Sequence, residues 1–151
     1  MSSSQGEDFP LVDRAARAIN TAKAALPYLT LGMPLISRGP EGSLHVDLPL
    51  MYNGFAVDRV HFDPLHMSLS PKGRPVRIYG SVDVSAIIKR VEDLLSGMEV
   101  LEGAEYREPE NAWAVPVVWR KLIVAHIKVR DGSWSIVPDY ALTEELRRRV
   151  V

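Results

Sequence analysis

The chain has 151 residues, a formal net charge of -1 and no cysteine. A chain of this length suits one domain with a sizeable core. Its content of 46% hydrophobic and 25% charged residues is typical of globular proteins and excludes a disordered or fibrous one. The lack of cysteine excludes disulfides, thiolate catalysis and cysteine-ligated zinc.

The apolar runs are far shorter than the ~20 residues of a membrane span. The beginning, "MSSSQGEDFP", lacks the basic and apolar regions of a secretory signal. We therefore expect a cytoplasmic protein without a membrane partner. Three Asn and one Gln beside many Glu, Arg and Val form a thermophile-like composition.

The near-neutral charge makes nucleic acid an unexpected partner. The alternative is a basic aromatic platform on which single-stranded nucleic acid could stack. Its residues would be Arg120, Lys121, Lys128 and Arg130, interleaved with Trp113 and Trp119.

Residues 1–8 are expected to be a flexible polar leader, and residues 9–151 a single domain. Apolar residues recur at helical spacing up to Leu26, which predicts a first helix with Asp8 as its cap and Pro27 as its stop. A second helix is predicted from Asp83 to Gly97. Its apolar positions are Val84, Ile87, Ile88, Val91, Leu94, Leu95 and Met98.

Strand-like runs flank Asn53-Gly54, the residue pair favoured in tight hairpin turns because both positions need positive φ. Further strands are predicted over residues 100–107, 112–119, 122–130 and 133–138, with a second tight turn at Asp131-Gly132. Arg120-Lys121 is a weaker two-residue turn, for which a longer loop is the alternative. No internal repeat is found. Short turns between successive strands predict an antiparallel sheet with two principal helices packed on one face, an α+β fold.

Three histidines and three aspartates fall within residues 45–66. A two-residue turn at Asn53-Gly54 would place His61 with Asp63 on one face of the hairpin and His45, Asp47 and Asp58 on the other. A metal needs three or four ligands that converge on one point, so the split predicts no metal site, and no cofactor motif is present. His61 held by Asp63 is a candidate general base, or a structural pair without catalysis.

The strands after residue 112 are apolar on both faces, so the second face of their sheet needs a cover. The alternatives are the chain's own core, a second copy or a small-molecule pocket. The candidate interface or ligand-binding residues are Trp113, Val115, Val117, Trp119, Val124, His126, Lys128 and Val137. His126 is also a candidate catalytic residue, with a half-buried structural histidine as the alternative. The opposite, alanine-bearing face is expected to receive the helices.

The segment "VRDGSWSIVPDY" from Val129 to Tyr140 resembles the last hairpin of NTF2-like and cystatin-like domains. The resemblance implies an alternative architecture in which a curved antiparallel sheet wraps a helix as a cone. It implies no functional residue.

Together these patterns predict a non-enzymatic protein-interaction or ligand-binding module that forms a homodimer, with a small-molecule ligand as a further possibility. The alternative is a small enzyme of the hydrolase or isomerase type. Its acid–base site would be built from His61, Asp63 or His126 in a pocket lined by the sheet.

Overall fold

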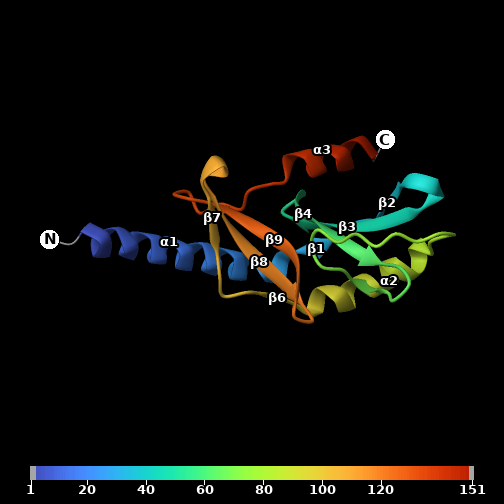
Figure 1. The fold of residues 1–151 in the computed structure, drawn as a ribbon, viewed down its shortest axis with the longest axis horizontal. Helices are drawn as coiled ribbons and strands as arrows, with labels where there is room; N and C mark the ends of the chain where they lie inside the picture. The colour runs from blue at the N-terminus through green and yellow to red at the C-terminus, as the bar shows by residue number, and fades with distance from the viewer. Residues whose placement is uncertain (1–2, 150–151) are drawn as a thin grey trace.

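A computed structural model describes the backbone of residues 3–149 and the side chains of residues 11–149. Over this range the fold is α+β, as predicted, with two antiparallel sheets (Figure 1). The α-helices are α1 (Ser3–Ala25), α2 (Val84–Ser96) and α3 (Tyr140–Arg149). Helix α1 begins within the expected leader, whose residues 1 and 2 lie outside the described residues. None of the described helices combines the length and apolar character needed to cross a membrane.

The first sheet contains β1 (Thr30–Leu31), β2 (Leu35–Arg38), β3 (Leu44–Tyr52), β4 (Phe55–Asp63) and β5 (Ser68–Leu69). Strand β3 pairs with β4 and also with β1 and β2, and β5 extends the sheet beyond β4. The second sheet contains β6 (Met98–Val100), β7 (Glu105–Arg107), β8 (Ala112–Trp119) and β9 (Leu122–Arg130). Strand β8 likewise pairs with β9 and with both β6 and β7. Short 3-10 helices lie at Leu26–Tyr28, Pro40–Gly42 and Glu108–Glu110.

The two sheets repeat one design, so the expectation of no internal repeat is wrong. Residue 49 corresponds to 116, 61 to 128 and 70 to 137, a constant offset of 67. The hydrogen bond from Gly32 N to the Pro49 carbonyl, 2.8 Å, matches that from Leu101 N to the Pro116 carbonyl, 2.9 Å. The bond from Ser70 N to the His61 carbonyl, 2.9 Å, matches that from Val137 N to the Lys128 carbonyl, 2.8 Å.

The tight turns repeat as well. Asn53 and Gly54 have φ values of 50° and 85°, and the equivalent Arg120 and Lys121 have 47° and 68°. Both pairs therefore form two-residue hairpin turns, although Arg and Lys rarely adopt positive φ. The turn at Asp131-Gly132 is longer than the predicted two residues, because Arg130 N donates to the Ser135 carbonyl across it.

Each long hairpin carries a β-bulge shortly after its turn. In the first, Met51 pairs with Ala56 but Leu50 pairs with Asp58, which leaves Val57 as an extra residue. One extra residue reverses the face of every later side chain relative to its partner strand. The predicted split of the histidines and aspartates is therefore wrong, since Asp47 lies directly opposite His61.

The second hairpin has its bulge at the equivalent place, because Val118 pairs with Ile123 and Val117 with Ala125. Val124 is the extra residue. As a result, Lys128 lies opposite Ala114 and His126 opposite Pro116, on the face away from the tryptophans. The tryptophan-bearing face, and not the alanine-bearing face, receives α1, whose Ala18 and Ala22 are fully buried against it.

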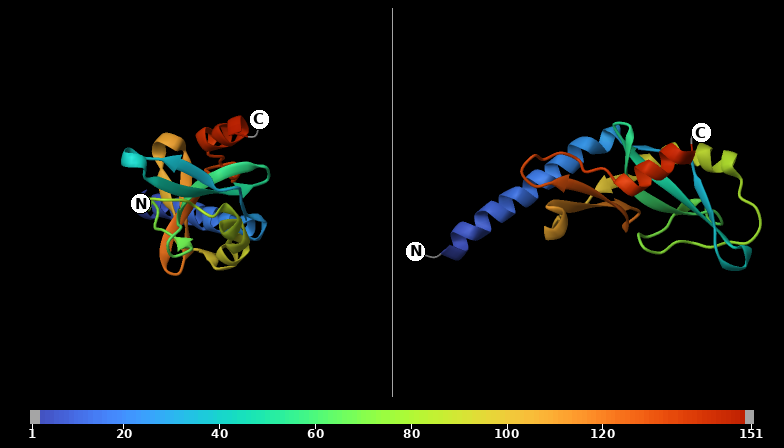
Figure 2. Two further views of the ribbon diagram at one scale, coloured as in Figure 1. Left: turned by 90° about the vertical axis from the view of Figure 1, so that its right-hand side faces the viewer. Right: turned by 90° about the horizontal axis from the view of Figure 1, so that it is seen from above.

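Helix α2 begins at the Asp83 side chain, which accepts a hydrogen bond from Ala86 N, and packs near β1. It buries Ile87 and Leu94, whereas Ile88 is 43% exposed. Helix α3 packs on β4 through Leu142. The N-terminal part of α1 projects beyond both sheets (Figure 2).

Candidate functional site

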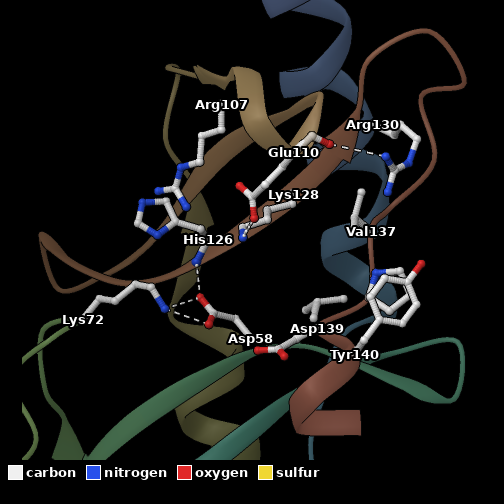
Figure 3. A pocket seen from close by; sticks show the side chains of 12 residues that line it. Asp58, Lys72, Arg107, Glu110, His126, Lys128, Arg130, Val137, Asp139 and Tyr140 are labelled. Carbon is white, nitrogen blue, oxygen red and sulfur yellow. Dashed lines mark hydrogen bonds and ion pairs between the residues drawn. The ribbon is translucent and has the colours of Figure 1, made fainter. Parts of the chain in front are cut away.

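A pocket of about 550 Å³ lies where β9 of the second sheet meets β4 of the first (Figure 3). This volume is within the range of small-ligand sites. Its lining residues come from four parts of the fold, namely β4, the 70–74 loop, the β7–β9 region and residues 137–140, which lead into α3. They are Val57, Asp58, Lys72, Arg107, Glu110, His126, Lys128, Arg130, Val137, Pro138, Asp139 and Tyr140.

The strand register explains why the positively charged side chains of the pocket lie close together. Arg107, Ala112 and Arg130 lie opposite one another across β7, β8 and β9. Residues opposite each other in antiparallel strands point to the same face. With a strand spacing of about 4.8 Å, the two arginine backbones are about 10 Å apart, and long side chains can converge across the small alanine. Lys128 and His126 follow on the same face of β9.

Asp58 closes the pocket at the junction of the sheets. Its carboxylate accepts the backbone N–H of His126 at 2.7 Å, and both of its oxygens lie 2.7 Å from Lys72 Nζ. Because Asp58 is only 8% exposed, these partners compensate the cost of burying its charge.

The charges that line the pocket do not cancel. Lys72, Arg107, Lys128 and Arg130 supply four positive charges, against three negative charges from Asp58, Glu110 and Asp139, which leaves a net charge of +1. Each carboxylate is already engaged. Asp58 binds Lys72, Glu110 binds Lys128, and Asp139 caps α3 by accepting Leu142 N at 3.0 Å.

The two arginines keep spare donors. Arg130 contacts the Glu110 carbonyl at a long 3.4 Å, and Arg107 lies 3.9 Å from Glu105. A guanidinium group has five N–H donors in a planar fork that matches carboxylate and phosphate groups. Among the side chains that the structure describes, the pocket therefore has more cationic donors than acceptors.

His126 brings an imidazole between Lys72 and Arg107 (Figure 3). Burial lowers the pKa of His126, nearby Lys72 lowers it further, and the attraction of Asp58 opposes both effects. Its Nδ1 is enclosed without a hydrogen-bond partner among the described residues. The ring is therefore neutral at pH 7.

A second polar cluster lies on the outer face of the first sheet. Asp47 is 1% exposed and accepts hydrogen bonds from His61 Nδ1 at 2.6 Å and Arg59 Nη1 at 3.0 Å. Arg59 also binds Glu145 of α3 at 2.9 Å, and His45 Nε2 lies 3.5 Å from Asp47. Burial raises the pKa of Asp47, but the hydrogen bonds from His61 and Arg59 outweigh it and lower that pKa overall.

The structure separates the predicted acid–base pair. His61 binds Asp47 across the hairpin, whereas Asp63 accepts Leu65 N at 2.9 Å and His66 Nδ1 at 2.7 Å in the following turn. His61 is not among the residues that line the pocket, whereas His126 is. Among the described residues, no group of three or more His, Asp or Glu side chains could hold a metal ion.

The structure divides the candidate interface residues into a core group and a pocket group. Those on the core side are buried within this chain, namely Trp113, Val115, Val117, Trp119 and Val124. The others, His126, Lys128 and Val137, line the pocket.

Sequence reasoning did not assign Asp58, Lys72, Arg107, Glu110 or Tyr140 to a pocket. One local similarity was present, since Arg-Gly-Pro-Glu at residues 38–41 and Arg-Glu-Pro-Glu at residues 107–110 occupy corresponding connections in the two halves, but it indicates the repeat and not the pocket.

Comparisons with protein-family models, curated proteins and solved structures found no match. The likeness of residues 129–140 to NTF2-like and cystatin-like domains thus has no further support. Function must be inferred from the site.

The Asp47 cluster predicts acid sensitivity. The pKa of Asp47 is lower in the folded protein than its ordinary value of 3.8, so the ionised carboxylate stabilises the fold at pH values above 3.8. This stabilisation is lost as the pH falls from 3.8 through the lower pKa of the folded state. Urea unfolding between pH 7 and pH 2 should show this loss, with a shallower pH dependence in Asp47→Asn. The exposed Asp93→Asn should behave as wild type. If the free energy of unfolding depended on pH equally in Asp47→Asn and in wild type, the role of Asp47 would be contradicted.

Proposed function

We propose that the protein is a non-enzymatic binding module whose ligand presents an anionic group to the pocket between the sheets. The observation that carries the proposal is the pair of arginines, Arg107 and Arg130, whose donors are left largely unused after the pocket's carboxylates have found partners. Buried or half-enclosed guanidinium groups favour carboxylate or phosphate partners, to which they donate two parallel hydrogen bonds.

The rest of the lining favours a ligand with an apolar part beside its charge. Val57, Val137 and Pro138 border the cationic group, and Tyr140 is 68% exposed at the start of α3. A ligand that has only charge would leave these apolar surfaces in water, whereas an amphipathic one would cover them.

Homodimerisation remains part of the proposal, on a different surface from the predicted one. Trp113 and Val117 are buried in this chain's core, so they are not accessible to a second copy of the folded chain. Leu11 and Val12 of α1 are exposed apolar residues that a second copy could cover.

A second candidate function is acid–base catalysis, which the position of His126 favours. A neutral imidazole in a pocket beside cations can accept a proton from a bound substrate, while the arginines hold the substrate's anionic group. The reaction would be of the hydrolase or isomerase type.

The binding proposal predicts that pyrophosphate and citrate bind to the pocket. Isothermal titration calorimetry at low salt should detect both anions, and the double variant Arg107→Gln, Arg130→Gln should weaken them at least tenfold, about 1.4 kcal/mol. The control is Arg38→Gln, Arg74→Gln, which removes the same charge from exposed sites outside the pocket. Equal weakening by both double variants would show non-specific attraction, and the absence of binding at 10 mM anion would contradict the proposal.

The catalytic candidate predicts turnover of chromogenic esters or phosphate monoesters. His126→Gln should abolish this activity, whereas the exposed control His66→Gln should retain it. Absence of turnover, or equal turnover by both variants, would remove the catalytic candidate and leave the binding proposal in place.

A further inference from the structure

The histidine of the pocket stands where the first sheet has an arginine. His126 and Arg59 differ by the offset of 67. Each lies directly opposite a proline, Pro116 in one sheet and Pro49 in the other. The two positions are therefore structurally equivalent. They differ in charge, because an arginine is always charged whereas a histidine gains or loses its charge near neutral pH.

The permanent charge on the first sheet is neutralised within the chain. Arg59 Nη1 lies 3.0 Å from Asp47, and Arg59 Nη2 lies 2.9 Å from Glu145 of α3. On the second sheet, Ala114 stands in the position of Asp47. An arginine at residue 126 would lack the carboxylate that serves Arg59, and an uncompensated charge is costly in a half-buried site. A histidine avoids this cost, because it can stay neutral until an anion binds.

The charged groups that face His126 explain why its ring is neutral without a ligand. Lys72 of the 70–74 loop and Arg107 of β7 are positive, and the ring lies between them (Figure 3). Asp58 of β4 and Glu105 of β7 are negative. Burial lowers the pKa of His126 most, Lys72 and Arg107 lower it further, and the two carboxylates do not outweigh these effects. Asp58 is already engaged, since it lies 2.7 Å from Lys72 Nζ and accepts the backbone N–H of His126 at 2.7 Å.

A bound anion would reverse this balance. Lys128 and Glu110 are paired with each other, so an anion that contacts Arg107 would cancel part of the repulsion on a protonated imidazole. Among the described residues, Nδ1 of His126 is enclosed without a partner, whereas Nε2 is not enclosed in this way. Since His126 lines the pocket, Nε2 is the ring nitrogen that a ligand can reach. In the imidazolium form it donates a charge-assisted hydrogen bond to an anion.

We propose that His126 binds the ligand as an imidazolium, so that the pocket takes up a proton with its ligand and selects a doubly charged oxyanion, such as a phosphoryl or sulfate group. The proton comes from solvent and stays on the ring until the ligand leaves. It raises the net charge of the lining from +1 to +2. A doubly charged group neutralises this charge, whereas a singly charged group leaves part of it unpaired. The inference rests on the proposed anion-binding function and names the ligand class of that site.

Calorimetric titration of sulfate at pH 8 and pH 5.5 tests the proton uptake. Sulfate keeps both charges over this range, so a pH dependence of its affinity must come from the protein. Wild-type affinity should rise at least about fivefold at pH 5.5, because the protonated form of His126 is more populated there and binds the anion more tightly. His126→Gln should lose this rise. The control His66→Gln, at an exposed histidine outside the pocket, should retain it.

Methanesulfonate tests the selection of double charge, because it presents sulfonate oxygens like those of sulfate but has one negative charge. At pH 5.5 wild-type protein should bind it about tenfold more weakly than sulfate, and the difference should shrink in His126→Gln. Equal affinities of the wild-type protein for the two anions would overturn the selection of a doubly charged group.

A second measurement does not depend on the folding of a variant. The ring resonances of His126 in wild-type protein are followed by NMR from pH 8 to pH 5 with and without saturating sulfate. Sulfate should move the titration midpoint of His126 to higher pH, and it should leave the titration of His66 where it is. A midpoint of His126 that sulfate does not move would overturn the proposal.

The outcomes separate this inference from the proposed function. If sulfate binds equally at pH 8 and pH 5.5, the proton uptake is overturned while anion binding stands. If the affinity rises at pH 5.5 equally in wild type and in His126→Gln, another group takes the proton and the role of His126 is overturned. If neither sulfate nor pyrophosphate binds at 10 mM, both the inference and the proposed function fail.

Discussion

The two sheets are joined by a reciprocal pair of backbone hydrogen bonds, and the position of the pocket depends on them. Lys72 N donates to the Ile123 carbonyl at 2.8 Å, and the equivalent Asp139 N donates to the Ala56 carbonyl at 2.8 Å. The exchange is symmetric, because 72 and 139, like 56 and 123, differ by 67. Asp58 adds a side-chain connection to His126 N and Lys72 Nζ that has no counterpart in the other half, where Ala125 stands in its place. The junction is therefore polar on one side only, and the pocket is on that side.

The symmetry makes the differences between the halves informative. The first sheet satisfies its own outer cations with Asp47 and with Glu145 of α3, so its outer face is complete within the chain. On the second sheet, His126 stands in the position of Arg59, Lys128 in that of His61 and Ala114 in that of Asp47, and Ile123, the equivalent of Ala56, is 39% exposed. A repeat in which one copy is closed and the other open favours a binding role for the open copy.

The sequence was sufficient for the fold class and for the turn at Asn53-Gly54, since these depend on local preferences and on hydrophobic period. The sequence was not sufficient to predict which face of the sheet each side chain occupies. A bulge at Val57 or Val124 has no residue signature, yet it reverses the face of every side chain beyond it relative to the partner strand. For this reason Asp47 lies on the same face as His61, and His126 lies on the opposite face from Trp113, contrary to the prediction. The repeat was hidden because only four of the 29 aligned positions in residues 44–72 and 111–139 are identical, namely Pro49, Val57, Ser68 and Pro71 with Pro116, Val124, Ser135 and Pro138. Pocket residues such as Arg107 and Lys72 come together through this arrangement of the two halves, which no local pattern shows.

The central claim is that the pocket beside the second sheet, where Ala114 stands in the position of Asp47, binds an external anion. Supplying a carboxylate at residue 114 tests this claim most directly, by calorimetric titration of pyrophosphate into Ala114→Asp and into its neutral isostere Ala114→Asn. We expect the aspartate to pair with Lys128, which lies directly opposite residue 114, and to compete with the anion. Affinity for Ala114→Asp should then be at least tenfold lower than for Ala114→Asn. Equal affinities in two folded variants would contradict the claim.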